Sequence, residues 1–169
     1  MSLATFCPNI LSRELVHVRS TYDALALSGS SPSLAVLRRD FGAHKIETVI
    51  KAHLIDLCDN INLKRPLRDI QIDNIAREVV AEFYSLTMAD IHVIFRKAKM
   101  GEYGEFFESL DMPKVMTWFR EYFSDRCAIA AQENISGRFR DANDPRSSEL
   151  ARRHFDKLEQ QFRIKNNKT

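Results

Sequence analysis

Residues 86–122 read LTMADIHVIFRKAKMGEYGEFFESLDMPKVMTWFREY and contain the clearest helix signals in the chain. Thr87, followed three residues later by Asp90, is typical of a capping box, in which a hydroxyl and a carboxylate satisfy the free amides of a first helical turn. Apolar residues then recur at steps of three and four as far as Ala98, and Gly101 is suited to end the helix in a left-handed conformation. The pattern predicts an amphipathic helix that begins after Thr87.

A second helix is predicted after an intervening turn rich in glycine and aromatic residues. Asp111 is suited to cap it, and Pro113 is tolerated because the amides of a first turn have no partner within the helix. The apolar pattern continues to about Gln132. Residues 134–148 are polar and contain glycine and proline, which predicts a flexible linker before a last amphipathic helix that begins after Ser148.

Upstream of this stretch the sequence has helical periodicity throughout. It predicts a helix from about residue 9 to Leu27, a short helix capped by Ser31 and ending at Gly42, a long helix over residues 44–61, and a helix that begins at Asp69. The third of these has the most regular apolar face, so we expect it at the centre of the core. The fold class is therefore predicted as all-α: a compact bundle of about six to seven helices, with a helical domain over residues 1–135 and a basic linker and C-terminal helix over residues 136–169.

Composition limits the class of protein. The chain has 169 residues, enough for a core without disulfides, and its three cysteines are widely spaced with no CxxC pair, which favours a reducing compartment. No apolar run reaches the roughly 20 residues needed to cross a bilayer, and the first residues do not resemble a signal peptide. We therefore expect a cytoplasmic protein with no membrane partner. Residues 136–169 hold nine Lys and Arg against five Asp and Glu, whereas the remainder holds 16 against 18.

The residue types that carry catalysis are present but not grouped. The five histidines are dispersed, and no pair has the HxxxH or HExxH spacing that sets two metal ligands on one helical face. Gly101 and Gly104 follow a predicted helix instead of preceding one, which is the wrong polarity for a phosphate-binding loop. His53 lies in an apolar face and is expected to be a hydrogen-bonded core residue. The sequence predicts no enzyme, no metal site and no cofactor.

A cluster of cations and aromatic rings between the two central helices is the main candidate site. Cations that bind phosphates, beside a ring that stacks on a base, are typical of proteins that bind single strands. The proposed residues are Arg96, Lys97, Lys99 and Tyr103. Alternatively, the cations complement the negative end of the helix dipole, and Tyr103, Phe106 and Phe107 fix the turn onto the core.

The C-terminal region offers a second set of candidates. A mobile arginine-rich segment can hold nucleic acid by neutralising phosphates, and it can equally serve as a solubilising linker. The arginines concerned are Arg138, Arg140, Arg152 and Arg153. If the last helix does not pack on the body, Phe155 and Phe162 are exposed and, with Phe106 and Phe107, are candidates for contact with a protein partner or a second copy of the chain.

The central stretch also resembles a known group of proteins. The resemblance is carried by a string of the form LTxxDIxxxFxxxKxGxYG and by residues in the helix after it: Leu86, Thr87, Asp90, Ile91, Phe95, Lys99, Gly101, Tyr103, Gly104, Leu110, Asp111, Trp118, Tyr122 and Arg126. They are similar to a domain of unknown function in small proteins of Bacteroidetes and their phages and mobile elements. The resemblance covers about residues 31–131, implies a role in replication of such an element, and supplies no catalytic residues.

Two functions are predicted from these observations. The first is a non-enzymatic, nucleic-acid-associated accessory protein whose partners are single- or double-stranded nucleic acid and a replication protein. The alternative is a protein interaction adaptor, or a small homo-oligomer, that uses the aromatic turn and the C-terminal helix to contact protein.

Overall fold

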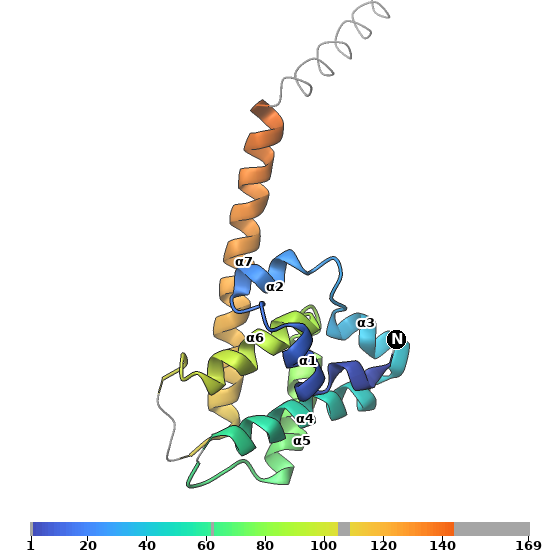
Figure 1. The fold of residues 1–169 in the computed structure, drawn as a ribbon, viewed down its shortest axis with the longest axis vertical. Helices are drawn as coiled ribbons and strands as arrows, with labels where there is room; N and C mark the ends of the chain where they lie inside the picture. The colour runs from blue at the N-terminus through green and yellow to red at the C-terminus, as the bar shows by residue number, and fades with distance from the viewer. Residues whose placement is uncertain (1, 62, 105–108, 144–169) are drawn as a thin grey trace, which may run out of the picture. The chain divides into compact units, whose positions relative to one another are not determined.

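The structure, a computed structural model, describes residues 2–61, 63–104 and 109–143, with side chains described as far as Asn134. A short 3₁₀ helix, η1 (Leu3–Phe6), precedes seven α-helices in these residues: α1 (Pro8–Glu14), α2 (Thr21–Ala26), α3 (Leu34–Phe41), α4 (Ala43–Asn60), α5 (Asp69–Glu82), α6 (Met88–Lys99) and α7 (Met112–Asn143) (Figure 1). The described residues contain no β-strand, which confirms the all-α prediction. None of their helices combines the length and the hydropathy that crossing a membrane would require. By its contacts the chain divides into two units, Met1–Cys127 and Ala128–Thr169, and the core described below lies in the first.

Helix α4 is the centre of the core, as its periodicity predicts. It packs against α1, α3, α5 and α6 (Figure 1). The face that contacts them carries Ile46, Ile50, Leu54 and Leu57, none of which has any exposed surface. His53 lies on the same face and is only 3% exposed, so its predicted place in the core is confirmed.

The predicted start of α6 is also confirmed in detail. The hydroxyl of Thr87 accepts a hydrogen bond from the Asp90 amide at 3.3 Å, and the Asp90 carboxylate accepts from the Thr87 amide at 2.7 Å. These two bonds form the capping box. The helix ends at Lys99, and Gly101 follows in the left-handed region with φ 77°.

Helix α7 begins as predicted and packs against α6 and the C-terminal end of α5. The Asp111 carboxylate accepts a hydrogen bond from the Lys114 amide at 3.0 Å, which caps the first turn. One turn further on, the ring of Phe119 lies 5.4 Å from that of Phe83 and 6.0 Å from that of Phe95. The aromatic residues of α7 thus join the C-terminal end of α5 to the middle of α6.

The predicted helix from residue 9 to Leu27 is wrong, because the chain breaks between α1 and α2. Ser20 forms a capping box with Asp23, and the Asp23 carboxylate also accepts from the Arg19 amide at 3.0 Å. These side-chain hydrogen bonds replace the backbone hydrogen bonds of a continuous helix, so a new helix starts at Thr21. The break places Val18 in the core, where it is 7% exposed. The apolar residues Leu11, Val18 and Tyr22 keep helical spacing across the break, although Tyr22 is 56% exposed, and this spacing explains why the sequence resembles one helix.

Ser31 was predicted to cap the helix that follows it, but that cap is Ser33. The Ser31 hydroxyl accepts instead from the amide of Ala89, in the first turn of α6, at 3.0 Å. Ser33 and Thr87 also form an isolated antiparallel bridge. In turn the Leu34 amide, in the first turn of α3, donates to the Leu86 carbonyl at 2.8 Å. The loops before α3 and α6 therefore cap each other's helices, although Ser31 and Ala89 are 58 positions apart.

The linker predicted from residue 134 is wrong as far as Asn143, because α7 continues to that residue. No proline occurs between Pro113 and Pro145, and one glycine inside a helix costs only about 1 kcal/mol relative to alanine. The neighbouring Arg and Gln residues are good helix formers, so polarity alone does not interrupt the helix. The rest of the predicted linker and the last helix lie outside the described residues.

Candidate functional site

The three cations in the last turn of α6 lie in different surroundings. The Nζ of Lys97 is 3.8 Å from Oε2 of Glu102, within the turn that follows the helix. Lys99 forms an ion pair and a hydrogen bond with Asp56 of α4. Arg96 forms no ion pair with any described residue and is only partly exposed. Of the three side chains, Arg96 is the one whose charge is left for a ligand.

Arg96 and Lys99 line a pocket where α1, α4 and α6 meet. The cavity has a volume of about 250 Å³. Its lining comes from α6 (His92, Phe95, Arg96, Lys99 and Met100), from α4 (His53 and Asp56), and from α1 and the segment after it (Pro8, Ser12, Val16 and Arg19). On α6 the polar members have spacings of four and three, which places His92, Arg96 and Lys99 on one face of the helix. We call this cavity the α6 pocket.

The α6 pocket has an excess of positive charge. Arg19, Arg96 and Lys99 supply three cations, whereas Asp56 is the one carboxylate in the lining, which leaves two positive charges in excess within the lining. Outside the lining, the carboxylate of Asp23 interacts with the charge of Arg19. Asp56 is moreover neutralised by Lys99. An anion that enters the pocket therefore meets the guanidinium groups of Arg19 and Arg96 without a competing free carboxylate in the lining.

The two histidines of the lining are held neutral. His53 Nε2 lies 2.9 Å from the Phe6 carbonyl, to which it donates, and its ring stacks on that of Phe95 with 5.3 Å between centroids. Burial lowers the pKa of His53 to about 4. Burial, followed by the nearby charge of Arg96, also lowers the pKa of His92. At neutral pH the positive charge of the pocket therefore comes from arginine and lysine alone.

His92 differs from His53 in one respect. It is 8% exposed, and its Nε2 is buried without a hydrogen-bond partner among the described residues. The carbonyls of Val18 and Leu15 lie close enough to favour its charged form, but neither makes a hydrogen bond of good geometry. A buried polar atom without a partner is uncommon in a folded protein and calls for a physical reason.

Tyr103 is not presented at the protein surface beside the cations. Its ring stacks on that of Trp118 in α7, with 5.4 Å between centroids and 13° between planes. Burial raises the pKa of its hydroxyl, and the Oη atom has no hydrogen-bond partner among the described residues. These contacts correspond to the alternative in which the aromatic residues of the turn fix it to the core.

The remaining predicted site residues lie where the structure describes no side chains. Those outside the described residues are Phe106, Phe107, Arg152, Arg153, Phe155 and Phe162. Arg138 and Arg140 belong to the last turns of α7, but their side chains are outside the described part.

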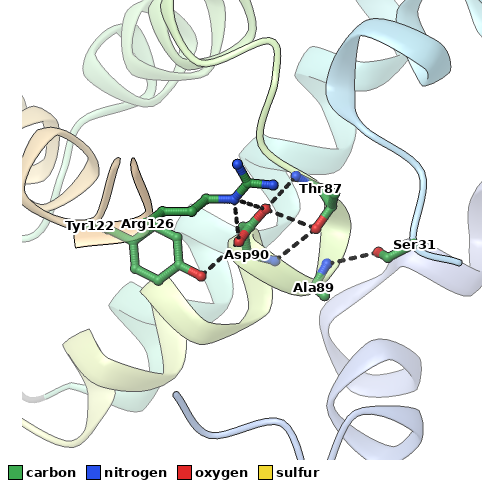
Figure 2. Close-up of polar contacts among 6 residues, drawn as sticks. All are labelled: Ser31, Thr87, Ala89, Asp90, Tyr122 and Arg126. Atoms are coloured by element: carbon green, nitrogen blue, oxygen red, sulfur yellow. Dashed lines mark hydrogen bonds and ion pairs between the residues drawn. The ribbon is translucent and has the colours of Figure 1, made fainter. Parts of the chain in front are cut away.

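Sequence reasoning missed a buried polar network on the other side of α6 (Figure 2). The Asp90 carboxylate has no exposed surface and accepts from Tyr122 Oη at 2.8 Å, from Arg126 Nε at 3.1 Å to each oxygen, and from Thr87 Oγ1 at 2.9 Å. With the Thr87 amide added, both carboxylate oxygens are fully used. The network is therefore a structural connection between α6 and α7, and it leaves no carboxylate lone pair for a substrate.

Two spacings in the sequence indicate parts of the Asp90 network and of the α6 pocket. Tyr122 and Arg126 are four residues apart and so lie on one face of a helix, as do His92 and Arg96. Asp56, Arg19 and the N-terminal residues of the pocket have no such signal, because they belong to separate segments: α4, the chain between α1 and α2, and α1 itself.

Comparisons with known proteins add no relative. No protein-family model, no curated protein and no solved structure matches the chain. Within the part of the chain that the structure describes, no group of three or more His, Cys, Asp or Glu side chains is arranged to hold a metal ion.

Proposed function

We propose that this chain is a non-enzymatic, nucleic-acid-associated accessory protein that binds phosphate groups at the α6 pocket. The observation that carries the proposal is the convergence of Arg19, Arg96 and Lys99 on one cavity whose single carboxylate is already paired. Arginine is suited to this task because its planar fork matches two phosphate oxygens at once. Lys97 and the arginines of the C-terminal region would extend the surface along a strand.

The chemistry of the lining supports binding. His53 is engaged with the Phe6 carbonyl, and Asp56 is engaged with Lys99. The one carboxylate of the lining is therefore neutralised before an anion enters, and it does not compete with the anion for the arginines. The role in replication of a phage or mobile element stays a prediction that follows from the resemblance of residues 31–131.

Oligonucleotide binding at several salt concentrations tests this proposal. We expect fluorescence anisotropy to detect binding of labelled single or double strands that weakens steeply with salt, because each neutralised phosphate releases counterions. Arg96→Glu should weaken binding and reduce the slope of log K against log salt by about one or more. Arg39→Glu is the matched control: it makes the same charge change on α3, where Arg39 forms an exposed pair with Asp40.

The control variant should bind like the unaltered protein. Equal weakening by the two variants would mean that only overall charge matters, and would contradict a site at the α6 pocket. If no oligonucleotide binds at low salt, the nucleic-acid proposal is wrong.

A second candidate function, protein interaction, is favoured by apolar surface at the same place. Val16 and Met100 line the α6 pocket and are 49% and 65% exposed. An adaptor or a small oligomer would bury these side chains against a partner or a second copy. Under this alternative, Met100→Asp changes the mass measured by light scattering or abolishes partner binding.

A further inference from the structure

We propose that the α6 pocket takes a phosphomonoester, the terminal phosphate of a nucleic-acid strand or of a mononucleotide, in preference to the phosphodiesters inside a strand. This inference deepens the proposed function and rests on it. It assigns a specific chemical group to the pocket, whereas the proposed function requires only a surface that attracts phosphates.

The first argument is the shape of the pocket. His53 and His92, which form part of its lining, are more than nine-tenths buried, so the cavity reaches into the body of the protein. An internal phosphodiester is joined to sugars on both sides and follows a surface groove. A terminal phosphate has one free end and can enter a cavity of about 250 Å³ with its nucleoside left at the mouth. There the exposed side chains of Val16 and Met100 supply apolar surface.

The second argument is charge. A phosphomonoester carries between about −1.5 and −2 charges at pH 7, whereas a phosphodiester carries one negative charge per phosphate. The α6 pocket has two positive charges in excess, from Arg19, Arg96 and Lys99 against Asp56. The pocket therefore compensates a phosphomonoester almost completely and overcompensates a single phosphodiester.

The third argument is the unpartnered nitrogen of His92. A neutral imidazole can place its proton on Nε2 and donate to an anionic oxygen, and such hydrogen bonds are stronger than those between neutral groups. His92 Nε2 lacks an acceptor among the described residues but is itself buried, so a rotation of the ring would bring it to a phosphate oxygen in the pocket. Arg96 lies one helical turn from His92 on the same face, so both can reach one tetrahedral group.

The test uses the full-length protein and short oligothymidine probes labelled at the end opposite the group under study. We expect a probe with a terminal phosphate to bind at least about tenfold more tightly than the same probe with a terminal hydroxyl, since charge-assisted hydrogen bonds are lost with the phosphate. Probes with 5′ and 3′ phosphates are compared separately. Thymidine monophosphate, but not thymidine, should compete with the phosphorylated probe if a free nucleotide is also a ligand.

Two variants locate the preference. Arg96→Gln should abolish it, whereas Arg39→Gln should preserve it. His92→Leu should also abolish it while leaving the unfolding midpoint unchanged or higher, because this variant removes a buried polar atom without a partner. A variant that folds at least as well but has lost the phosphate preference separates a binding role of His92 from a structural one.

The outcomes separate this inference from the proposed function. Salt-sensitive binding that is equal for phosphate and hydroxyl ends overturns the inference and leaves the nucleic-acid function standing. Binding of thymidine monophosphate without binding of any oligonucleotide supports the pocket assignment, identifies a free nucleotide as the source, and overturns the nucleic-acid function. A phosphate preference that persists in Arg96→Gln overturns the α6 pocket as the site.

Discussion

At the scale of single residues, His53 illustrates how burial sets charge. Its folded pKa of about 4 lies below the ordinary value of 6.5, so the unfolded chain binds its proton more readily than the folded one. Folding stability from this group is therefore fully present above pH 6.5 and is lost as the pH falls toward 4. The free energy lost over this interval is roughly 3 kcal/mol, which urea unfolding at several pH values will measure.

The matched variant is His53→Gln, whose amide can still donate to the Phe6 carbonyl but does not titrate between pH 4 and 7. It should be less stable than the unaltered protein at pH 7 and should depend less on pH. Burial lowers the pKa of His92 as well, so part of the acid dependence should remain in the variant. An equally steep loss of stability in both proteins would contradict the assignment to His53.

At the scale of elements, the Asp90 network joins α6 to α7. Asp90 is fully buried and the Arg126 side chain is 15% exposed, so removal of one partner leaves the other without compensation away from water. We expect Asp90→Asn and Arg126→Met each to cost about 3–5 kcal/mol of unfolding free energy. The double variant should cost less than the sum by roughly 1–3 kcal/mol, which denaturant unfolding of all four proteins will measure.

Arg120 provides the control on the same helix. It pairs with Glu82 of α5, but the two side chains are 58% and 43% exposed. Arg120→Met should therefore cost less than about 1 kcal/mol. If this variant destabilised the protein as strongly as Arg126→Met, the effect would come from the loss of any arginine on α7, and the Asp90 network would not be its cause.

At the scale of the whole molecule, the core described by the structure is complete before the last turns of α7. Among the described residues, every buried hydrophobic side chain lies between Phe6 and Tyr122. A chain that ends at Gln132 should therefore keep its far-ultraviolet circular dichroism band per residue and unfold within about 0.5 kcal/mol of the full chain. It should also keep the phosphate preference of the α6 pocket.

The same shortened chain tests the predicted role of the C-terminal arginines. If it folds but binds oligonucleotides only weakly, the tail supplies most of the affinity, and the α6 pocket supplies the preference for an end. If the shortened chain does not fold, the prediction of an independent core is wrong, and residues beyond Gln132 contribute to stability.

Part of the fold and of the site could be predicted from short-range patterns. The capping box of α6, the end of α6 and the buried face of α4 depend on residues within four positions of one another, where side chain and backbone meet directly. Two neighbouring pairs of pocket residues on α6, His92 with Arg96 and Arg96 with Lys99, lie within the same range. Local patterns also gave a wrong prediction. The polar residues after 133 indicated a linker, whereas α7 continues to Asn143 because most of these residues tolerate a helix.

By itself, then, the sequence determined an all-α chain, the helix starts at Thr87 and Asp111, and the central position of the helix that contains His53, because caps and apolar periodicity are local properties. Only the tertiary structure decided that Lys99 pairs with Asp56, that Tyr103 stacks on Trp118, and that Arg126 lies on Asp90. These partners are between 15 and 43 positions apart. These contacts depend on how whole helices pack against one another, so they cannot be predicted from the pattern within a single helix.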